Sequence, residues 1–328
     1  MRAIVQHEYG SPDVLRFAEV DRPRPGDGEV LVRVRAASVN ARDWHLMRGD
    51  PAVARLLSPS VFGLRGPRSP IRGSDFAGTV EETGPGVSGL RPGDEVYGYA
   101  DGSFAEYVCA PAGSVCPKPV TLSFAEAAAV PLAASTALVA LRDVGRAGAG
   151  DRVLVNGASG GVGTFAVQIG KILGSEVTGV CGARNVELVG SAGADHVIDY
   201  RRDDFTRGGL RYDVVLDLVA NRSVTALRRA VKRDGTAVLA GGGVSEGGSL
   251  FRPFGLIVRS RLVAPFVPQR LALVDAPPTQ ETLTGLRDLV EAGRLRPVID
   301  RTYPLSKAAE AIRYLEDEHA RAKVVLVV

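Results

Sequence analysis

The segment of this chain best suited to bind a reactive cofactor is rich in glycine and begins at residue 156. It follows the apolar run Val153–Val155 and precedes a helical pattern over Thr164–Leu173. Glycine permits tight turns with positive φ, and the first N–H groups of a helix attract an anion. Strand, glycine loop and helix in this order predict a pyrophosphate site for a dinucleotide, and the alternative is a tight turn that binds nothing. The residues expected at this site are Gly157, Ala158, Ser159, Gly160, Gly161, Val162 and Gly163.

The end of the next strand indicates which dinucleotide would fit. An NAD site usually carries an acidic residue about 20 residues beyond the glycines, where it binds the ribose hydroxyls. Here the strand Glu176–Cys181 ends in Gly182, Ala183 and Arg184, with no acid at its tip. A carboxylate would repel a 2′-phosphate, whereas the planar guanidinium of Arg184 can bind one. We therefore predict NADPH as cofactor; the alternative is that Arg184 is a solvated loop residue.

The cysteines and histidines are too few and too scattered to predict a metal site. A structural zinc ion needs about four close cysteine or histidine ligands. We predict no bound metal and, from the cysteine count, no disulfide framework. The residues concerned are Cys109, Cys116, Cys181, His7, His45, His196 and His319.

Two domains must position these residues, because 328 residues are too many for one ordinary core. Residues 1–122 show period-two strands such as Val30–Ala36 between glycine- and proline-rich turns, which predicts a β-rich domain. Within them, residues 51–70 lack a period and are expected to be a loop over a binding site or a surface insertion. Residues 123–265 alternate strands with helices and predict a doubly wound parallel sheet. Residues 266–328 are expected to return to the first domain.

Composition excludes several classes of protein. The chain has 40 basic and 37 acidic residues, a net charge of +3, which is too balanced for a nucleic-acid-binding protein. No apolar stretch reaches the roughly 20 residues that span a bilayer. The first residues, Met1–Glu8, break their apolar run too early for a secretory signal. We therefore expect a cytoplasmic protein without a membrane or nucleic-acid partner.

Several motifs together resemble the medium-chain dehydrogenase/reductase superfamily, and more narrowly its zinc-free quinone oxidoreductase branch. Besides the glycine loop they are Val39–Asp43, Gly73–Gly78, Gly93–Gly98 and Gly193–Asp195. The resemblance covers nearly the whole chain. It implies a GroES-like catalytic domain, built from both ends of the chain, around a central Rossmann domain. It also implies a homodimer paired through the edges of the Rossmann sheets.

The same resemblance bears on metal and on cofactor. Zinc alcohol dehydrogenases of this superfamily have a cysteine ligand near the position of Asn40 and a Gly-His-Glu triplet at that of Gly73–Asp75. Neither ligand is present here, and the four-cysteine lobe expected after Tyr97 is missing. The run Cys181–Asn185 is similar to that of chloroplast-envelope quinone oxidoreductase homologues, which reduce activated double bonds with NADPH.

The resemblance also implies the site residues. It places Asn40 beside the nicotinamide ribose and the substrate. His45 stands where many members have tyrosine, so it either donates a proton near neutral pH or lines the pocket. Asp43 is expected to pair with Arg48 and orient the loop, and Trp44 is expected either to face a quinone or to fill the core. The catalytic candidates are thus Asn40, His45 and Asp43, and the further cofactor contacts are Thr136, Tyr200, Gly241, Gly242 and Lys323.

These features predict a reaction. Without a metal, no Lewis acid polarises an unactivated carbonyl, whereas quinones and α,β-unsaturated carbonyls accept a hydride through their own conjugation. We expect an oxidoreductase that transfers hydride from NADPH to such a small-molecule acceptor. The alternatives are a metal-independent NADP-linked alcohol dehydrogenase and a non-catalytic NADPH-binding protein.

Overall fold

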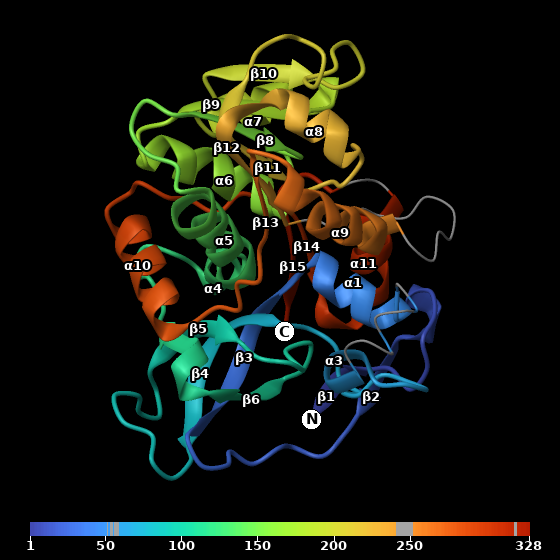
Figure 1. Ribbon diagram of the computed structural model, residues 1–328. Coiled ribbons are helices and arrows are strands. Elements are labelled where there is room, and N and C mark those ends of the chain that lie inside the picture. The colour runs from blue at the N-terminus through green and yellow to red at the C-terminus, as the bar shows by residue number, and fades with distance from the viewer. Residues whose placement is uncertain (51, 53–54, 56–58, 241–251, 318–319) are drawn as a thin grey trace. The chain divides into compact units, whose positions relative to one another are not determined.

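The computed structural model describes residues 1–50, 52, 55, 59–240, 252–317 and 320–328. The chain divides into two units (Figure 1). The first combines Met1–Ser135 with Pro277–Val328, and the second is Thr136–Ala276. Within the described ranges, none of the helices is long and apolar enough to cross a membrane.

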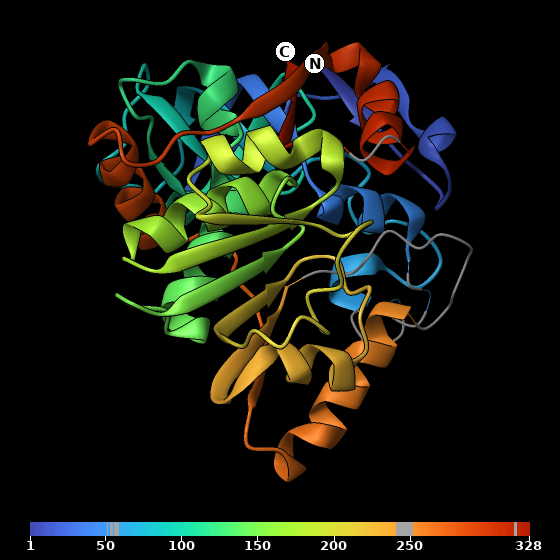
Figure 2. The same cartoon turned by 90° about the horizontal axis from the view of Figure 1, so that it is seen from above.

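The second unit is built on a parallel sheet of six strands in the order β10-β9-β8-β11-β12-β13. In chain order this sequence is 3-2-1-4-5-6, the arrangement of dinucleotide-binding domains. Figure 2 shows the strands lying side by side with the twist expected of such a sheet. The strands are β8 (Arg152–Asn156), β9 (Glu176–Cys181), β10 (His196–Asp199), β11 (Tyr212–Asp217), β12 (Val231–Leu239) and β13 (Arg270–Leu273).

The central strands of this sheet are buried on both faces. Residues Val153–Val155 of β8 and Val214–Leu216 of β11 are at most 2% exposed, as expected for strands covered by helices on each side. The predicted doubly wound fold is confirmed. The helices of the unit are η3 (Val139–Gly145), α6 (Gly161–Ile172), η4 (Ala183–Asn185), α7 (Val186–Ser191), α8 (Val224–Ala230), α9 (Arg252–Val263) and η5 (Ala264–Phe266).

The first unit is a β-rich domain in which the two ends of the chain meet. Its main sheet has the order β14-β15-β3-β4-β5-β7, with β6 also paired to β3. The C-terminal strand runs antiparallel to β3, with Val324 opposite Val39, so the predicted return of the C-terminal segment is observed. The strands are β3 (Glu29–Val39), β4 (Asp75–Thr83), β5 (Glu95–Tyr99), β6 (Tyr107–Pro111), β7 (Val115–Pro117), β14 (Ile299–Pro304) and β15 (Lys323–Val327), and a separate pair joins β1 (Arg2–Val5) to β2 (Arg16–Glu19).

Short helices surround this sheet. The one most relevant to function, α1, follows β3 directly, and α11 contacts β15, β14 and β3. The helices are η1 (Pro12–Val14), α1 (Ala41–Arg48), α3 (Pro59–Phe62), η2 (Ala112–Ser114), α4 (Phe124–Ala128), α5 (Pro131–Leu138, which ends in the second unit), α10 (Gln280–Glu291), η6 (Leu305–Lys307) and α11 (Ala308–Asp317).

The boundaries between the units lie further along the chain than the predicted ends at residues 122 and 265. The first falls after Ser135, because helix α4 packs against β3 and β4 of the first unit. The second falls after Ala276, because β13 is the sixth strand of the parallel sheet. Alternation of strands and helices therefore locates the sheet but does not show which unit an adjoining helix packs on.

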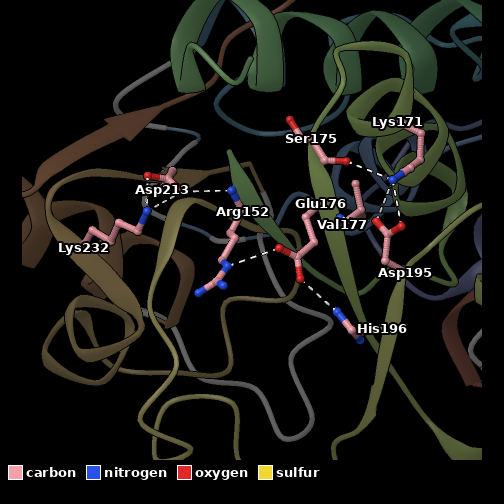
Figure 3. Close-up of polar contacts among 9 residues, drawn as sticks. All are labelled: Arg152, Lys171, Ser175, Glu176, Val177, Asp195, His196, Asp213 and Lys232. Carbon is pink, nitrogen blue, oxygen red and sulfur yellow. Dashed lines mark hydrogen bonds and ion pairs between the residues drawn. The ribbon is translucent and has the colours of Figure 1, made fainter. Parts of the chain in front are cut away.

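Charged contacts gather at the amino ends of the parallel strands (Figure 3). The Lys171 ammonium lies 2.7 Å from a carboxylate oxygen of Asp195. Glu176 pairs with Arg152 at 3.2 Å and with His196 at 2.9 Å. Ligands of such folds bind beyond the carboxyl ends of the strands. These charged groups lie at the opposite, amino ends, so we assign them a structural role.

Candidate functional site

The predicted glycine loop forms a turn between β8 and α6 in which only glycine fits. Gly157 has a φ of +91°, and a Cβ at Gly163 would lie 2.1 Å from the Gly157 carbonyl oxygen. The N–H groups of Gly157 and Ala158 donate to the Val180 carbonyl at 3.1 and 3.0 Å, so these two residues build the turn.

Helix α6 starts directly after this turn. Its N-cap, Gly160, is extended and supplies no side-chain cap. Gly160, Gly161 and Val162 are partly exposed, so the first N–H groups of the helix can face an anion. Ser159 is also partly exposed. The turn therefore fits the diphosphate of a dinucleotide, with Ser159–Val162 as the residues that would hold it.

The ends of β9 and β10 bring two further predicted residues to one place. Arg184 is exposed in η4, and Tyr200 is 44% exposed. Because a Cβ at Gly182 would lie 3.3 Å from the Tyr200 hydroxyl, glycine makes room for the tyrosine ring. Asn185, which the sequence did not single out, is buried and donates to Ser159 Oγ at 3.0 Å. It ties this region to the glycine loop.

A buried polar pair, also missed from the sequence, lies where the strand order reverses. Asn156 ends β8 and donates from its side-chain amide to Asp217 at the end of β11 at 2.8 Å. The same carboxylate oxygen accepts the N–H groups of Val219 and Ala220 at 3.1 Å each. Burial raises the pKa of Asp217. The signal that could have found the pair is a polar residue directly after three apolar strand residues, Val153–Val155 in β8 and Val214–Leu216 in β11.

The first unit holds Asn40 in one orientation. Lys323, which is 2% exposed, donates to Asn40 Oδ1 at 2.6 Å and to the Val39 carbonyl at 3.3 Å. The Asn40 amide nitrogen donates to Asp75 at 2.9 Å. Both ends of the amide are thus occupied within the protein, which fixes its rotation. Lys323 therefore orients Asn40, and its approach to the cofactor stays a prediction.

Asp75 is the centre of this cluster. Its carboxylate, 0% exposed, accepts hydrogen bonds from Ser38 Oγ at 3.0 Å and from the N–H of Leu132 at 3.1 Å. The Lys323 ammonium lies 3.8 Å away. Burial lowers the pKa of Lys323, and the negative charge of Asp75 opposes that shift. One buried carboxylate therefore links β3, β4, β15 and the start of α5.

Asp43 lies at the start of α1 and differs from its predicted arrangement. It is 2% exposed and accepts hydrogen bonds from Ser74 Oγ at 2.6 Å and from the Asn40 N–H at 2.8 Å. The predicted pairing with Arg48 is wrong, because Arg48 pairs with Glu316 of α11. Burial raises the pKa of Asp43 to about 6, against the opposing effect of these hydrogen bonds.

The remaining predicted residues are more dispersed. His45 is half-buried, with its Nδ1 3.1 Å from the Asp50 carbonyl, so it is positioned but not enclosed. Trp44 is 4% exposed within the hydrophobic core, which confirms the core alternative. Thr136 is partly buried on α5. Gly241 and Gly242 lie outside the described residues.

A pocket of about 640 Å³ opens beside Asp43 in the first unit. Part of its wall comes from the second half of segment 51–70, where residues Pro59–Phe62 form helix α3 and not the predicted loop. The lining combines apolar side chains with two aspartates and two arginines. It consists of Asp43, Leu46, Val61, Arg68, Ser69, Pro70, Ile71, Arg72, Gly73 and Asp101.

The residues at the superfamily's zinc positions come together around Asp43. Ser74 and the main chain of Asn40 both bond its carboxylate. A hydroxyl and an amide are poor substitutes for the thiolate and imidazole that zinc prefers. In the described part of the chain, no group of three or more His, Cys, Asp or Glu side chains could hold a metal ion.

Two family models match the chain. The first, described as an alcohol dehydrogenase GroES-like domain, matches residues 26–120. The second, described as a zinc-binding dehydrogenase, matches residues 192–326. Their positions agree with the β-rich unit and with most of the parallel sheet together with the returning C-terminal segment.

Similar proteins and solved structures show more narrowly to which group of dehydrogenases the chain belongs. A chloroplastic quinone-oxidoreductase of Triphysaria versicolor is 32% identical over 99% of this chain and 98% of its own length. The quinone oxidoreductase of Coxiella burnetii has a similar structure, with a TM-score of 0.85, 30% identity and coverage of 100% and 99% of the two chains. The chain belongs to the quinone oxidoreductase branch of the medium-chain dehydrogenase/reductase superfamily.

The name of a further relative mentions a different class of hydride acceptor. An NADPH-dependent alkenal/one oxidoreductase from Arabidopsis thaliana is 30% identical over 99% of this chain and 79% of its own length. As a member of this branch, the protein is an oxidoreductase of the medium-chain type that uses a nicotinamide cofactor, in agreement with the glycine turn.

The Lys323–Asp75 pair generates a prediction about stability. Lys323→Met leaves the buried Asp75 carboxylate without its cation, which should lower the free energy of unfolding by about 3–5 kcal/mol. Urea unfolding followed by circular dichroism measures this change. The matched control is Arg2→Ala, which breaks an ion pair with Glu106 whose arginine side chain is 65% exposed and should cost less than about 1 kcal/mol. Equal small losses would remove the buried pair from its structural role.

Proposed function

We propose that the protein transfers hydride from NADPH to quinones or α,β-unsaturated carbonyls without a metal. The observation that carries the proposal is that Asn40 and Ser74, which stand where zinc relatives have metal ligands, both donate hydrogen bonds to Asp43. These side chains supply no strong Lewis acid, so the acceptor must be activated by its own conjugation. The named activities of the quinone and alkenal/one relatives support the same acceptors.

The chain's contribution is binding and orientation. The nicotinamide, when bound, supplies the hydride. The start of α6 would hold the diphosphate through its N–H groups, and Asn40 would present a fixed amide because Lys323 and Asp75 occupy both of its ends. Fixing a polar group in advance lowers the cost of orienting the reactants.

The acceptor proposal is tested by a substrate panel. With NADPH, we expect turnover of 1,2-naphthoquinone and of trans-2-hexenal but not of cyclohexanone, because only the first two accept hydride through conjugation. Treatment with EDTA should leave the rates unchanged. Steady-state oxidation of NADPH at 340 nm measures all of them. Turnover of the simple ketone alone would instead indicate an alcohol dehydrogenase, and tight cofactor binding without any turnover a non-catalytic protein.

The preference for NADPH over NADH rests on Arg184 and Tyr200, because no carboxylate follows β9 directly. Arg184→Ala should raise KM for NADPH about ten- to hundredfold, the loss expected for a charged hydrogen bond, and KM for NADH less than about threefold. The matched control is Arg233→Ala, which removes an exposed arginine from the amino-terminal half of β12 and should change neither value. Equal losses with both cofactors would contradict the assignment of Arg184 to the 2′-phosphate.

Asp43 is proposed as the proton source for the reduced enone. It lines the pocket, and burial raises its pKa to about 6, so its neutral form persists well above the pH at which an ordinary aspartic acid ionises. We expect kcat/KM for trans-2-hexenal to fall as pH rises through about 6. Asp43→Asn should lower kcat and remove this inflection. A profile that keeps its shape in Asp43→Asn would assign the proton to solvent or to His45.

A homodimer paired through the second unit is proposed as the assembly. Strand β13 lies at the edge of the parallel sheet, where unpaired backbone groups can bind another strand. Three exposed apolar side chains follow a four-residue spacing nearby, with Val258 50%, Leu262 66% and Phe266 86% exposed. Sedimentation velocity tests this proposal, and a concentration-independent monomer would contradict it.

A further inference from the structure

Arg72 is a buried cation without an anionic partner in the described ranges. It is 5% exposed, and no carboxylate oxygen of those residues lies within 4.0 Å of its guanidinium. The Nη2 group donates to the Ser69 carbonyl, while Nε is buried and bonds none of the described residues. Burying a charge in this way is costly unless a partner compensates for it.

Backbone hydrogen bonds fix the position of Arg72 in the chain. The Arg72 N–H donates to the Ile4 carbonyl at 3.1 Å, and its carbonyl accepts the Phe104 N–H at 2.8 Å. The next residue, Gly73, has a φ of +99°, and a Cβ there would lie 2.5 Å from the Phe104 nitrogen. A tight, glycine-dependent turn therefore positions Arg72 against the pocket that it lines.

The two acids of the pocket are committed to other groups. Asp43 accepts hydrogen bonds from Ser74 and from the main chain of Asn40, and Asp101 pairs with Arg42 at 2.9 Å. The negative charges of Asp43 and Asp101 act on Arg72 and oppose the fall in its pKa that burial causes, but neither carboxylate forms an ion pair with it. The N–H groups of Arg72 that face the pocket are therefore not bound to either acid, and Arg68 lies in the same pocket wall.

We propose that this pocket binds the carboxylate of an anionic acceptor, with Arg72 as its ion-pair partner. A guanidinium suits a planar carboxylate because its N–H groups form a fork. Leu46, Val61 and Ile71 provide an apolar wall for the conjugated part of the molecule. The substrate class is then an enone or quinone that bears a carboxylate. This inference rests on the proposed function, since it names the acceptor within that reaction.

The first experiment uses the wild-type protein and two acceptors that differ only in charge. They are 4-(4-carboxyphenyl)but-3-en-2-one and its carboxamide, each reduced with NADPH. We expect kcat/KM for the carboxylate to exceed that for the carboxamide by about ten- to hundredfold, mainly through KM, as for a hydrogen bond between charged groups. Equal values would overturn the proposal, whether or not any variant folds.

The second experiment assigns the preference to Arg72. Arg72→Met should remove the preference for the carboxylate and change kcat/KM for the carboxamide less than about threefold. Arg65→Ala is the matched control, because Arg65 is exposed in the neighbouring segment and does not line the pocket. Circular dichroism and NADPH binding report whether each variant is folded. Equal losses on both acceptors would show that Arg72 serves the fold and not the substrate.

A third measurement separates this inference from the proposed reaction. The saturated ketone 4-(4-carboxyphenyl)butan-2-one cannot be reduced at a double bond, so its binding by titration calorimetry does not depend on catalysis. Binding that is lost in Arg72→Met would support the carboxylate site even if neither enone were turned over. Absence of binding to the wild-type protein would refute the site while leaving quinone or enone reduction intact.

Discussion

The carboxylate of Asp75 is the constraint on which the first unit depends. It is fully buried, so it must be compensated, and its partners come from three distant parts of the chain: Ser38 and Asn40, Leu132, and Lys323. A buried carboxylate near a buried ammonium tolerates little displacement of either, because separation leaves an unpaired charge in a medium of low dielectric constant. The cluster therefore stabilises the pairing of β15 with β3, and the same contacts orient the side-chain amide of Asn40.

The buried charged groups near Asp75 in the first unit also support the proposed substrate class. Hydroxyl and amide groups stand at the superfamily's zinc positions, and they hold Asp43 inside the protein with a raised pKa. Arg72, which lines the same pocket, forms no ion pair among the described residues, and its Nε has no hydrogen-bond partner there. A weak acid, a guanidinium without an ion-pair partner and an apolar wall in one pocket are the features on which the proposed carboxylate-bearing acceptor rests.

In the second unit, the backbone and not a buried charge positions the proposed binding site. Gly157 and Gly163 allow β8 and α6 to approach so closely that no side chain fits between them. This approach directs the start of α6 toward the edge where the strand order reverses. Asn156, Asp217 and Asn185 then fix the surrounding turns through buried hydrogen bonds.

The sequence by itself determined the parallel sheet, the glycine turn, the β-rich unit and the return of the C-terminal segment. Those features follow from local periodicity and from residue types that only certain backbones accept, or from motifs shared with a family. The tertiary structure alone decided the partners of Asp43, Arg48 and Lys323, and the position of the unit boundaries. It also revealed that the buried guanidinium of Arg72 has no ion-pair partner among the described residues. The reason is physical. The hydrogen-bond partners of a buried charged group can lie as far as 284 positions away in the chain, and no local sequence pattern indicates which of these distant residues come into contact.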